Sequence, residues 1–225
     1  VLSCITNHTP YPYPIIKYIL DSALNSDLFT KIHVSTESKR IKEEVQNIGY
    51  EIDFMRPQEL SDDFTPLIPV LQYVVEKYEE ISMSFDEIWL LMACNPLITS
   101  STLVRAAELF SSTYPASQPL IAIKEYPVPI EWAYKKEDQS KYIKPLFPEK
   151  LSKRSQDLTP YYHDAGAFEI YSPNQLKKPS DKLIKSNYLG FLLGKNESID
   201  IDSLEDWELA ESIYKYRYPR GFSSN

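Results

Sequence analysis

The sequence predicts a doubly wound α/β fold with a mostly parallel sheet, and three observations support this prediction. Short apolar runs alternate with stretches of helical periodicity through the first two-thirds of the chain. The connections between them are short, as in repeated strand–helix–strand units with right-handed crossovers. The run Glu87–Met92 is nearly continuous in apolar residues, which is typical of a strand covered on both faces of its sheet. A chain of 225 residues is long enough to bury the core of one such domain.

The expected strands and helices follow one another in the order that this fold requires. Short apolar runs predict strands at 1–5, 31–35, 51–54, 87–92, 120–123, 167–171 and 189–193. Apolar residues at helical spacing predict helices at 14–24, 38–49, 66–77, 99–110 and 203–213. Ser38 is expected to cap the second helix and Gly49 to end it. The last helix is expected to follow Ser203, whose spacing to Asp206 resembles a capping box.

Residues 127–162 interrupt this alternation. The stretch is rich in Pro, Tyr and Lys, and it shows neither the helical nor the strand period. It is too long for an ordinary loop in a compact domain, so we expect an excursion with a function of its own.

Charge and composition exclude several classes of protein. With 24 basic against 32 acidic side chains, the formal net charge is −8, which argues against nucleic-acid binding through sequence-independent phosphate contacts. No apolar run approaches the roughly eighteen residues of a membrane span. Cys4 and Cys94 lie far apart and outside any C-x-x-C, so we expect neither a disulfide framework nor a structural zinc site. A cytoplasmic protein without membrane or nucleic-acid partners is expected.

The pair Asp200 and Asp202 is the strongest candidate for chemistry. In a strand, Ile199 and Ile201 would face the core while the two carboxylates point together the other way. Neighbouring carboxylates repel each other unless a cation lies between them, and hard oxygen ligands suit Mg²⁺ bound jointly with the phosphates of a substrate. The alternative is that Asp200 is a solvated edge residue and Asp202 helps to cap the following helix.

Two further positions follow expected strands, where ligands of open α/β sheets bind. Arg56 comes after the third strand and offers a planar fork of donors to an anion, although a surface ion pair with Asp62 or Glu59 is an equal alternative. Asn95 ends the central strand and could donate to a base or a ribose. Its neighbour Cys94 is interpreted as a small core residue rather than a nucleophile.

A dense group of polar side chains precedes the strand expected at 167–171. Its members are Arg154, Gln156, Asp157, His163 and Asp164. Such a cluster could bind a hydroxylated and carboxylated ligand, and the alternative is a solvated loop.

Taken in order, these segments resemble the acylneuraminate cytidylyltransferases, which activate nine-carbon acidic sugars as CMP conjugates. Phe54–Thr65 is similar to the R-P-x-x-L-S-x-D stretch of that family, 27–36 to its second strand, and Ile199–Trp207 to its metal-binding I-D-I-D and following helix. The resemblance spans about 14–214. Within the family, 153–168 resembles the pseudaminic acid branch, and Met92 stands where the sialic acid branch carries Gln.

The resemblance implies a nucleotide-diphospho-sugar-transferase-like, Rossmann-like fold, with 1–225 as one cytidylyltransferase domain and 127–162 as an inserted arm for dimerisation and the sugar site. It implies a homodimer that transfers CMP from CTP to the anomeric hydroxyl of pseudaminic acid or a close relative, with Mg²⁺ as cofactor and pyrophosphate as product. The implied catalytic residues are Asp200, Asp202 and Arg56, the two aspartates as metal ligands. The implied nucleotide-binding residues are Arg56, Asp63, Ala93, Cys94 and Asn95. The implied sugar-binding residues are Met92, Arg154, Gln156, Asp157, His163, Asp164 and Phe168.

The start of the chain differs from the family pattern. Family members carry a phosphate-binding loop of the type A-R-x-G-S-K, whereas here Ile5 leads into Thr6 with no glycine, arginine or lysine before Lys17. We expect the full protein to contain a basic, glycine-bearing segment between Ile5 and Thr6 that the printed sequence lacks. The alternatives are a CMP synthetase for sialic or legionaminic acid, a metal-dependent glycosyltransferase, and a non-catalytic nucleotide- or sugar-binding relative without the loop.

Overall fold

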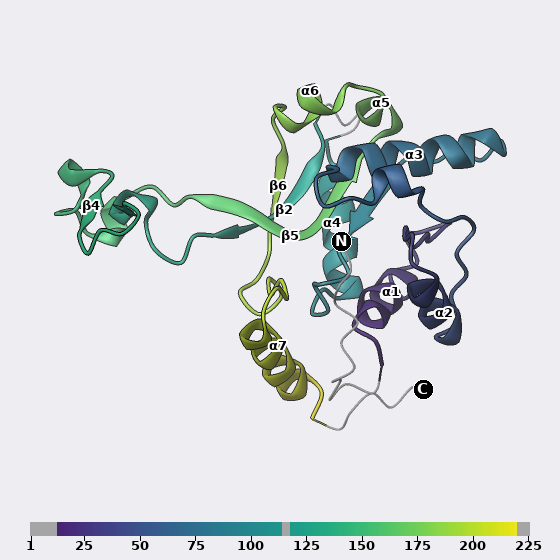
Figure 1. Cartoon of the computed structure of the whole chain (residues 1–225), viewed down its shortest axis with the longest axis horizontal. Coiled ribbons are helices and arrows are strands. Elements are labelled where there is room, and N and C mark those ends of the chain that lie inside the picture. The colour runs from purple at the N-terminus through teal and green to yellow at the C-terminus, as the bar shows by residue number, and fades with distance from the viewer. Residues whose placement is uncertain (1–12, 114–117, 220–225) are drawn as a thin grey trace.

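A four-stranded sheet forms the centre of the protein in a computed structural model that describes residues 13–113 and 118–219 (Figure 1). The strands are β1 (Ile88–Leu91), β2 (Leu120–Glu125), β5 (Tyr162–Tyr171) and β6 (Leu189–Leu192), and they lie in the order β1-β5-β2-β6. Strand β5 runs antiparallel to β1 and β2, whereas β6 runs parallel to β2. Three of the four strands therefore point the same way, which confirms the mostly parallel sheet expected from the sequence.

Helices pack on both faces of this sheet. The helices of the described residues are α1 (Ile16–Leu24), α2 (Lys39–Asn47), α3 (Leu67–Glu80), α4 (Ser100–Ser111), α5 (Pro173–Leu176), α6 (Ser180–Ile184) and α7 (Leu204–Arg217). Side chains of β1 alternate between the two faces: Trp89 and Leu91 contact the cluster that contains α1 and α4, while Ile88 and Leu90 contact α3, α5 and α6. Because both faces are covered, β1 needs apolar residues at every position, as its sequence predicts.

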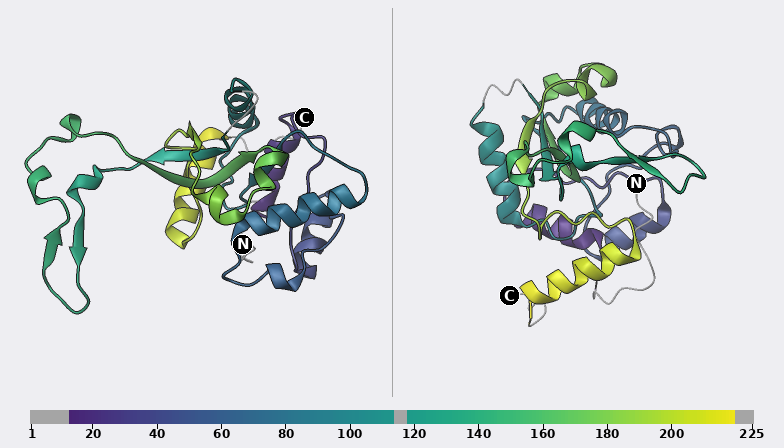
Figure 2. Two further views of the ribbon diagram at one scale, coloured as in Figure 1. Left: turned by 90° about the horizontal axis from the view of Figure 1, so that it is seen from above. Right: turned by 90° about the vertical axis from the view of Figure 1, so that its left-hand side faces the viewer.

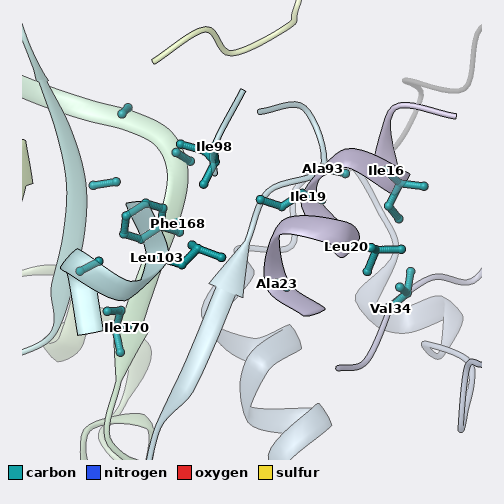
Figure 3. Packing of buried hydrophobic residues seen from close by; sticks show 14 of the residues in the cluster. Ile16, Ile19, Leu20, Ala23, Val34, Ala93, Ile98, Leu103, Phe168 and Ile170 are labelled. Carbon is teal, nitrogen blue, oxygen red and sulfur yellow. The ribbon is translucent and has the colours of Figure 1, made fainter. Parts of the chain in front are cut away.

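The main core lies between α1, α4 and the sheet (Figure 3). Helix α1 buries side chains at helical spacing, namely Ile16, Ile19, Leu20 and Ala23. Leu103 of α4 is completely buried and packs in the same cluster as Phe168 and Ile170 of β5. The dense apolar packing of this core fixes the positions of the elements around it. It therefore holds the edges of the sheet in place, where a site can form.

The helix ends follow the capping residues seen in the sequence. The Ser38 hydroxyl accepts a hydrogen bond from the Ile41 amide at 3.4 Å, and Gly49 ends α2 in the left-handed region with φ +90°. Before α7, Ser203 and Asp206 cap each other reciprocally, since each side chain accepts from the other's backbone amide. These expectations are confirmed. None of the helices in the described residues has the length and apolarity of a membrane crossing.

Two of the expected strands, and the segment 199–202 considered as a strand, are unpaired segments in the structure. Residues 31–35, 51–54 and 199–202 have no strand pairing, and the strand expected at 1–5 lies outside the described residues. A strand requires a ladder of hydrogen bonds to a neighbour, whereas these segments are held by bonds such as Arg56 N to Thr36 O at 2.9 Å and Ile201 N to Cys94 O at 3.0 Å. Sequence propensity does not reveal which extended segments find a pairing neighbour.

Between β2 and β5 the chain leaves the sheet as an arm, residues 126–161 (Figures 1 and 2). The arm contains the antiparallel pair β3 (Tyr134–Lys136) and β4 (Ile143–Pro145). It also contains three single-turn helices, η2 (Ile130–Trp132), η3 (Pro148–Lys150) and η4 (Ser155–Asp157). Figure 1 and the left view of Figure 2 show the arm extending beyond the body of the protein, with its β3–β4 pair away from the central sheet.

Candidate active site

Three segments meet where β1 ends. The turn that follows β1 is tied to β5 by a hydrogen bond from Met92 N to Ala167 O at 2.9 Å. The same turn accepts a bond from the segment before α7, from Ile201 N to Cys94 O at 3.0 Å. Residues 92–95, the middle of β5 and residues 199–202 therefore come together at the carboxyl end of a strand, where open α/β sheets bind their ligands.

A bulge in β5 shapes this junction. Ile121 pairs with Glu169, yet Ile123 pairs with Asp164, so β5 contains extra residues between these two pairs. Gly166 lies in the bulge with φ +63°, a conformation that glycine adopts without strain, and its amide donates to the Asp164 carboxylate at 2.7 Å. A Cβ on Gly166 would lie 2.5 Å from Oδ2 of Asp200. The bulge thus places bare backbone directly against the Asp200 carboxylate.

Asp200 and Asp202 differ in their surroundings. Asp200 is partly buried, and burial together with the charge of Asp202 raises its pKa, while hydrogen bonds from Cys94 and Asn95 and the charge of Lys124 oppose the rise. Asp202 is exposed.

The helix-capping alternative does not account for Asp202. The side chain that caps α7 belongs to Ser203, and the acidic partner in the box is Asp206, whose pKa is lowered mainly by the Ser203 hydroxyl. Asp202 contributes its backbone amide to Asp206 at 3.3 Å, and its carboxylate takes no part in the cap. The Asp202 carboxylate is therefore left for another role.

The donor set fits a divalent cation that is shared with a substrate. Asp200 and Asp202 supply hard oxygen ligands. Within residues 13–113 and 118–219, no group of three or more His, Cys, Asp or Glu side chains is arranged to hold a metal by itself. A cation at this pair would complete its coordination with water or phosphate oxygens, which is how Mg²⁺ is commonly bound.

Arg56 lies in the interior with 9% of its surface exposed. Its guanidinium forms an ion pair with Glu37 and donates from Nε to the Ser61 hydroxyl at 3.0 Å. The expected alternative of a surface pair with Asp62 or Glu59 is therefore wrong, because the arginine turns inward to a partner on a different segment. Asp62 instead accepts bonds from the residues that lead into α3.

An elongated cavity of about 240 Å³ connects Arg56 to the turn after β1. Its walls are mostly apolar and come from β1, α3 and residues 29–35, while Arg56, Met92 and Ala93 lie along it. The structure thus brings together three of the residues assigned to the ligand site. Asp63, assigned to the same site, is exposed beside the start of α3 and does not line the cavity.

The residues assigned to the sugar fall into two groups. Arg154, Gln156 and Asp157 lie in the arm and are exposed, and Arg154 and Asp157 pair with each other at 2.8 Å. His163 and Asp164 lie where β5 rejoins the sheet, with the His163 ring 4.7 Å from that of Tyr126.

Phe168 corrects the assignment made from the sequence. It is 1% exposed, and its ring packs in the core against Trp89 and Phe191 at centroid distances of 6.0 and 5.6 Å. A side chain enclosed in this way has no surface for a sugar, so we remove Phe168 from the site. The alternation of side chains expected along a strand did not reveal that Phe168 faces the core, because the bulge at Gly166 changes which side chains of β5 face inward.

Lys124 is a site residue that the sequence reasoning missed. It lies on β2 opposite His163, and its ammonium donates to Ser198 O at 3.3 Å. Its charge lowers the pKa values of both Asp200 and Asp206. The sequence signal for Lys124 is its place directly after the apolar run 120–123, where a buried strand would otherwise continue with an apolar residue.

Known proteins resemble the chain over most of its length. The family model described as cytidylyltransferase matches residues 12–189. Pseudaminic acid cytidylyltransferase of Campylobacter jejuni subsp. jejuni serotype O:2 is 34% identical over 211 residues, which cover 93% of this chain and 88% of that protein. CMP-N,N'-diacetyllegionaminic acid synthase of Legionella pneumophila subsp. pneumophila is 24% identical over 200 residues, with 89% and 84% covered.

A solved structure of CMP:2-keto-3-deoxy-manno-octonic acid synthetase complexed with CTP superposes with a TM-score of 0.60. Its sequence is 14% identical, and the match covers 90% of this chain and 88% of the other. Likeness at this identity shows the shared fold alone. The family match, in contrast, covers well over half of the sequence and contains Arg56 and the turn after β1. The chain therefore belongs to the cytidylyltransferase family and is a nucleotidyltransferase.

Proposed function

We propose that the protein transfers CMP from CTP to the anomeric hydroxyl of a nine-carbon acidic sugar in an Mg²⁺-dependent reaction. The sugar oxygen attacks the α-phosphorus of CTP, a new P–O bond forms, and the bond to the β-phosphate breaks to release pyrophosphate. The hydroxyl proton is lost to solvent. The observation that carries this proposal is the pair Asp200 and Asp202, held at the carboxyl end of β1 beside the cavity that Arg56 lines.

In this proposal the two aspartates supply charge for the cation, and the other residues position the ligand. Asp200 and Asp202 would hold Mg²⁺, which neutralises phosphate charge as it develops during transfer. Arg56 lines the nucleotide cavity with its guanidinium fixed by Glu37 and Ser61, so its direction is set before a ligand arrives. Met92 and Ala93 also line this cavity, in the turn whose Cys94 carbonyl accepts a hydrogen bond from Ile201 N between the two aspartates. No covalent intermediate on the protein is required, because the charge on the phosphate oxygens dominates the barrier.

Replacing one metal ligand tests the reaction. Asp202→Asn removes a charged ligand from an exposed side chain that caps nothing, so we expect a folded protein whose CMP transfer falls by roughly a thousandfold, about 4 kcal/mol of transition-state stabilisation. Glu205→Gln is the matched control, since Glu205 is an exposed acid of the first turn of α7. Pyrophosphate release from CTP measures both variants. Near-normal turnover by Asp202→Asn would refute the metal assignment.

We propose pseudaminic acid or a close relative as the sugar. The support is the 34% identity to a pseudaminic acid cytidylyltransferase and the string His163-Asp164-Ala165-Gly166. Pyrophosphate release with CTP and a panel of pseudaminic, legionaminic and N-acetylneuraminic acids separates the candidates. The diacetamido sugars should be used with higher kcat/KM. Equal or better use of N-acetylneuraminate would show that the substrate assignment is wrong while leaving the reaction type intact.

We also propose that the protein is a homodimer joined through the arm. The arm exposes a set of apolar and aromatic side chains: Tyr134, Tyr142, Ile143, Leu146 and Phe147. Exposed apolar side chains gathered on one segment are typical of an interaction surface. A second copy also offers a surface that the arm could reach, since in a single chain the arm extends away from the sheet (Figure 1).

Sedimentation tests the dimer. The wild-type protein should sediment as a dimer at micromolar concentration, and Ile143→Asp should shift it toward the monomer because a charge replaces an exposed apolar contact. Leu204→Asp is the matched control, since Leu204 is equally apolar and more exposed but lies on α7. A monomeric wild-type protein would contradict the proposal.

A further inference from the structure

Asn95 is a fully buried polar side chain at the centre of the candidate active site. It is 0% exposed, and its amide nitrogen donates to Gly166 O at 2.7 Å and to Asp200 Oδ1 at 3.2 Å. A primary amide has two hydrogens, so both are used inside the protein. The expectation that Asn95 binds the nucleotide is therefore not supported, because no donor remains for a base or a ribose.

The direction of this amide is set by its neighbours. The atoms nearest to its nitrogen are a backbone carbonyl and a carboxylate, which are both acceptors. With the amide reversed, its own oxygen would face those two acceptors, which is repulsive. In the observed orientation, Oδ1 is buried with no hydrogen-bond partner among the described residues. A buried acceptor without a partner is destabilising, so the bonds made by the nitrogen must outweigh this cost.

The Asp200 carboxylate is constrained on both oxygens. Asn95 binds Oδ1, and the bare Cα of Gly166 lies against Oδ2, where a Cβ would come within 2.5 Å. The bond from Ile201 N to Cys94 O fixes the backbone on the far side of Asp200. Asn95, Gly166 and the 199–202 segment thus enclose one carboxylate in one orientation, next to the exposed Asp202.

We propose that Asn95 is a positioning residue that orients the Asp200 carboxylate toward the cation shared with Asp202. This inference rests on the proposed function, since it needs a cation at the pair. Hydrogen bonds to ligating carboxylates are a common way to fix ligand geometry, and removing such a partner typically weakens metal affinity by about 10–100-fold. Because Asn95 is completely buried and both amide hydrogens are used within the protein, it would act through Asp200.

The test measures Mn²⁺ binding to the full chain by electron paramagnetic resonance in the absence of substrate. Asn95→Leu keeps the branched shape and the number of heavy atoms of asparagine but removes both donors, and Asn95→Ser keeps one hydroxyl donor and leaves room for water. We expect the affinity to fall in the order wild type, Ser, Leu, with Leu weaker than wild type by about 10–100-fold. In turnover assays the Leu variant should need more Mg²⁺ while recovering much of its kcat at saturation.

Two controls separate this inference from the proposed function. Asp202→Asn should lose Mn²⁺ binding, and if it binds as tightly as wild type, or if wild type binds no Mn²⁺, the metal assignment itself fails. Gln175→Met removes another buried polar side chain, which is 3% exposed and lies in α5, and should leave Mn²⁺ affinity unchanged. If Asp202→Asn loses the ion while the folded Asn95 variants bind it like wild type, the metal site stands and the positioning role of Asn95 is overturned.

Discussion

His33 should make the stability of this protein sensitive to mild acid. Its ring is stacked on Phe54 at a centroid distance of 4.3 Å and meets the edge of Tyr78 at 5.8 Å. Both ring nitrogens are buried without hydrogen-bond partners among the described residues. Burial lowers the pKa of His33 from 6.5 to about 4, a shift that the charge of Asp53 opposes and that of Lys31 reinforces.

The sign and the size follow from proton linkage. Between about pH 6.5 and pH 4 the unfolded chain binds a proton at this histidine and the folded chain does not, so the free energy of unfolding decreases as the pH falls. One pKa unit corresponds to about 1.4 kcal/mol. Lowering the pH from 7 to 5 should therefore remove up to about 2 kcal/mol, a large part of the stability of an ordinary domain. This value is an upper bound, because the ring retains some contact with solvent.

His33→Phe is the perturbation that isolates this effect. Phenylalanine keeps the aromatic stack on Phe54 but cannot take up a proton. Urea unfolding at pH 5, 6, 7 and 8 gives the free energy of unfolding of both proteins. Carboxylates such as Asp53, whose pKa is lowered by its contacts with Lys31 and Tyr78 despite partial burial, titrate largely below this range in both proteins. The free energy of unfolding of His33→Phe minus that of wild type should rise by up to about 2 kcal/mol as the pH falls from 7 to 5 and should stay constant above pH 7, and parallel curves from pH 5 to 8 would refute the reasoning.

Two further predictions concern the elements that hold the site. Ser203→Ala removes the hydroxyl that caps α7 and should cost about 1 kcal/mol of unfolding free energy, whereas Glu205→Ala in the same turn should cost much less; equal effects would show that the box contributes little. Leu103→Ala creates a cavity at a completely buried position and should cost about 3 kcal/mol in urea unfolding, with loss of less than about 1 kcal/mol contradicting the dense core described for α4.

Local signals in the sequence predicted much of the fold. The apolar stripe of α1 and the caps at Ser38 and Ser203 depend on neighbours within one or two turns, so the printed sequence contains them in full. The apolar run of β1 likewise requires cover on both faces, and both faces are covered. The segments 31–35 and 199–202 show the limit of such signals, because a strand depends on a partner that may lie anywhere in the chain.

The site depended on contacts that are distant in sequence. Arg56 takes Glu37 as its partner, so adjacency along the chain suggested the wrong alternatives, Asp62 and Glu59. Asn95 donates to Asp200, 105 residues away, a contact that its position at a strand end does not reveal. The bulge at Gly166 is equally hidden, since its reason is the approach of Asp200 to bare backbone. The order of motifs, rather than any single residue, indicated the family that the comparisons show.

Charge balance at the site gives an independent reason for a cation in the reaction. The charge of Lys124 acts on both Asp200 and Asp206, while Asp202 adds a further negative charge beside Asp200, so these three carboxylates outnumber the ammonium that acts on them. The proposed substrates, a nucleoside triphosphate and a carboxylated sugar, are anions as well. Bringing them together here would be opposed by repulsion that strengthens as water is displaced. A divalent cation between the aspartates and the phosphates turns that repulsion into attraction, which is why the same two carboxylates would bind CTP productively with Mg²⁺ and repel it without.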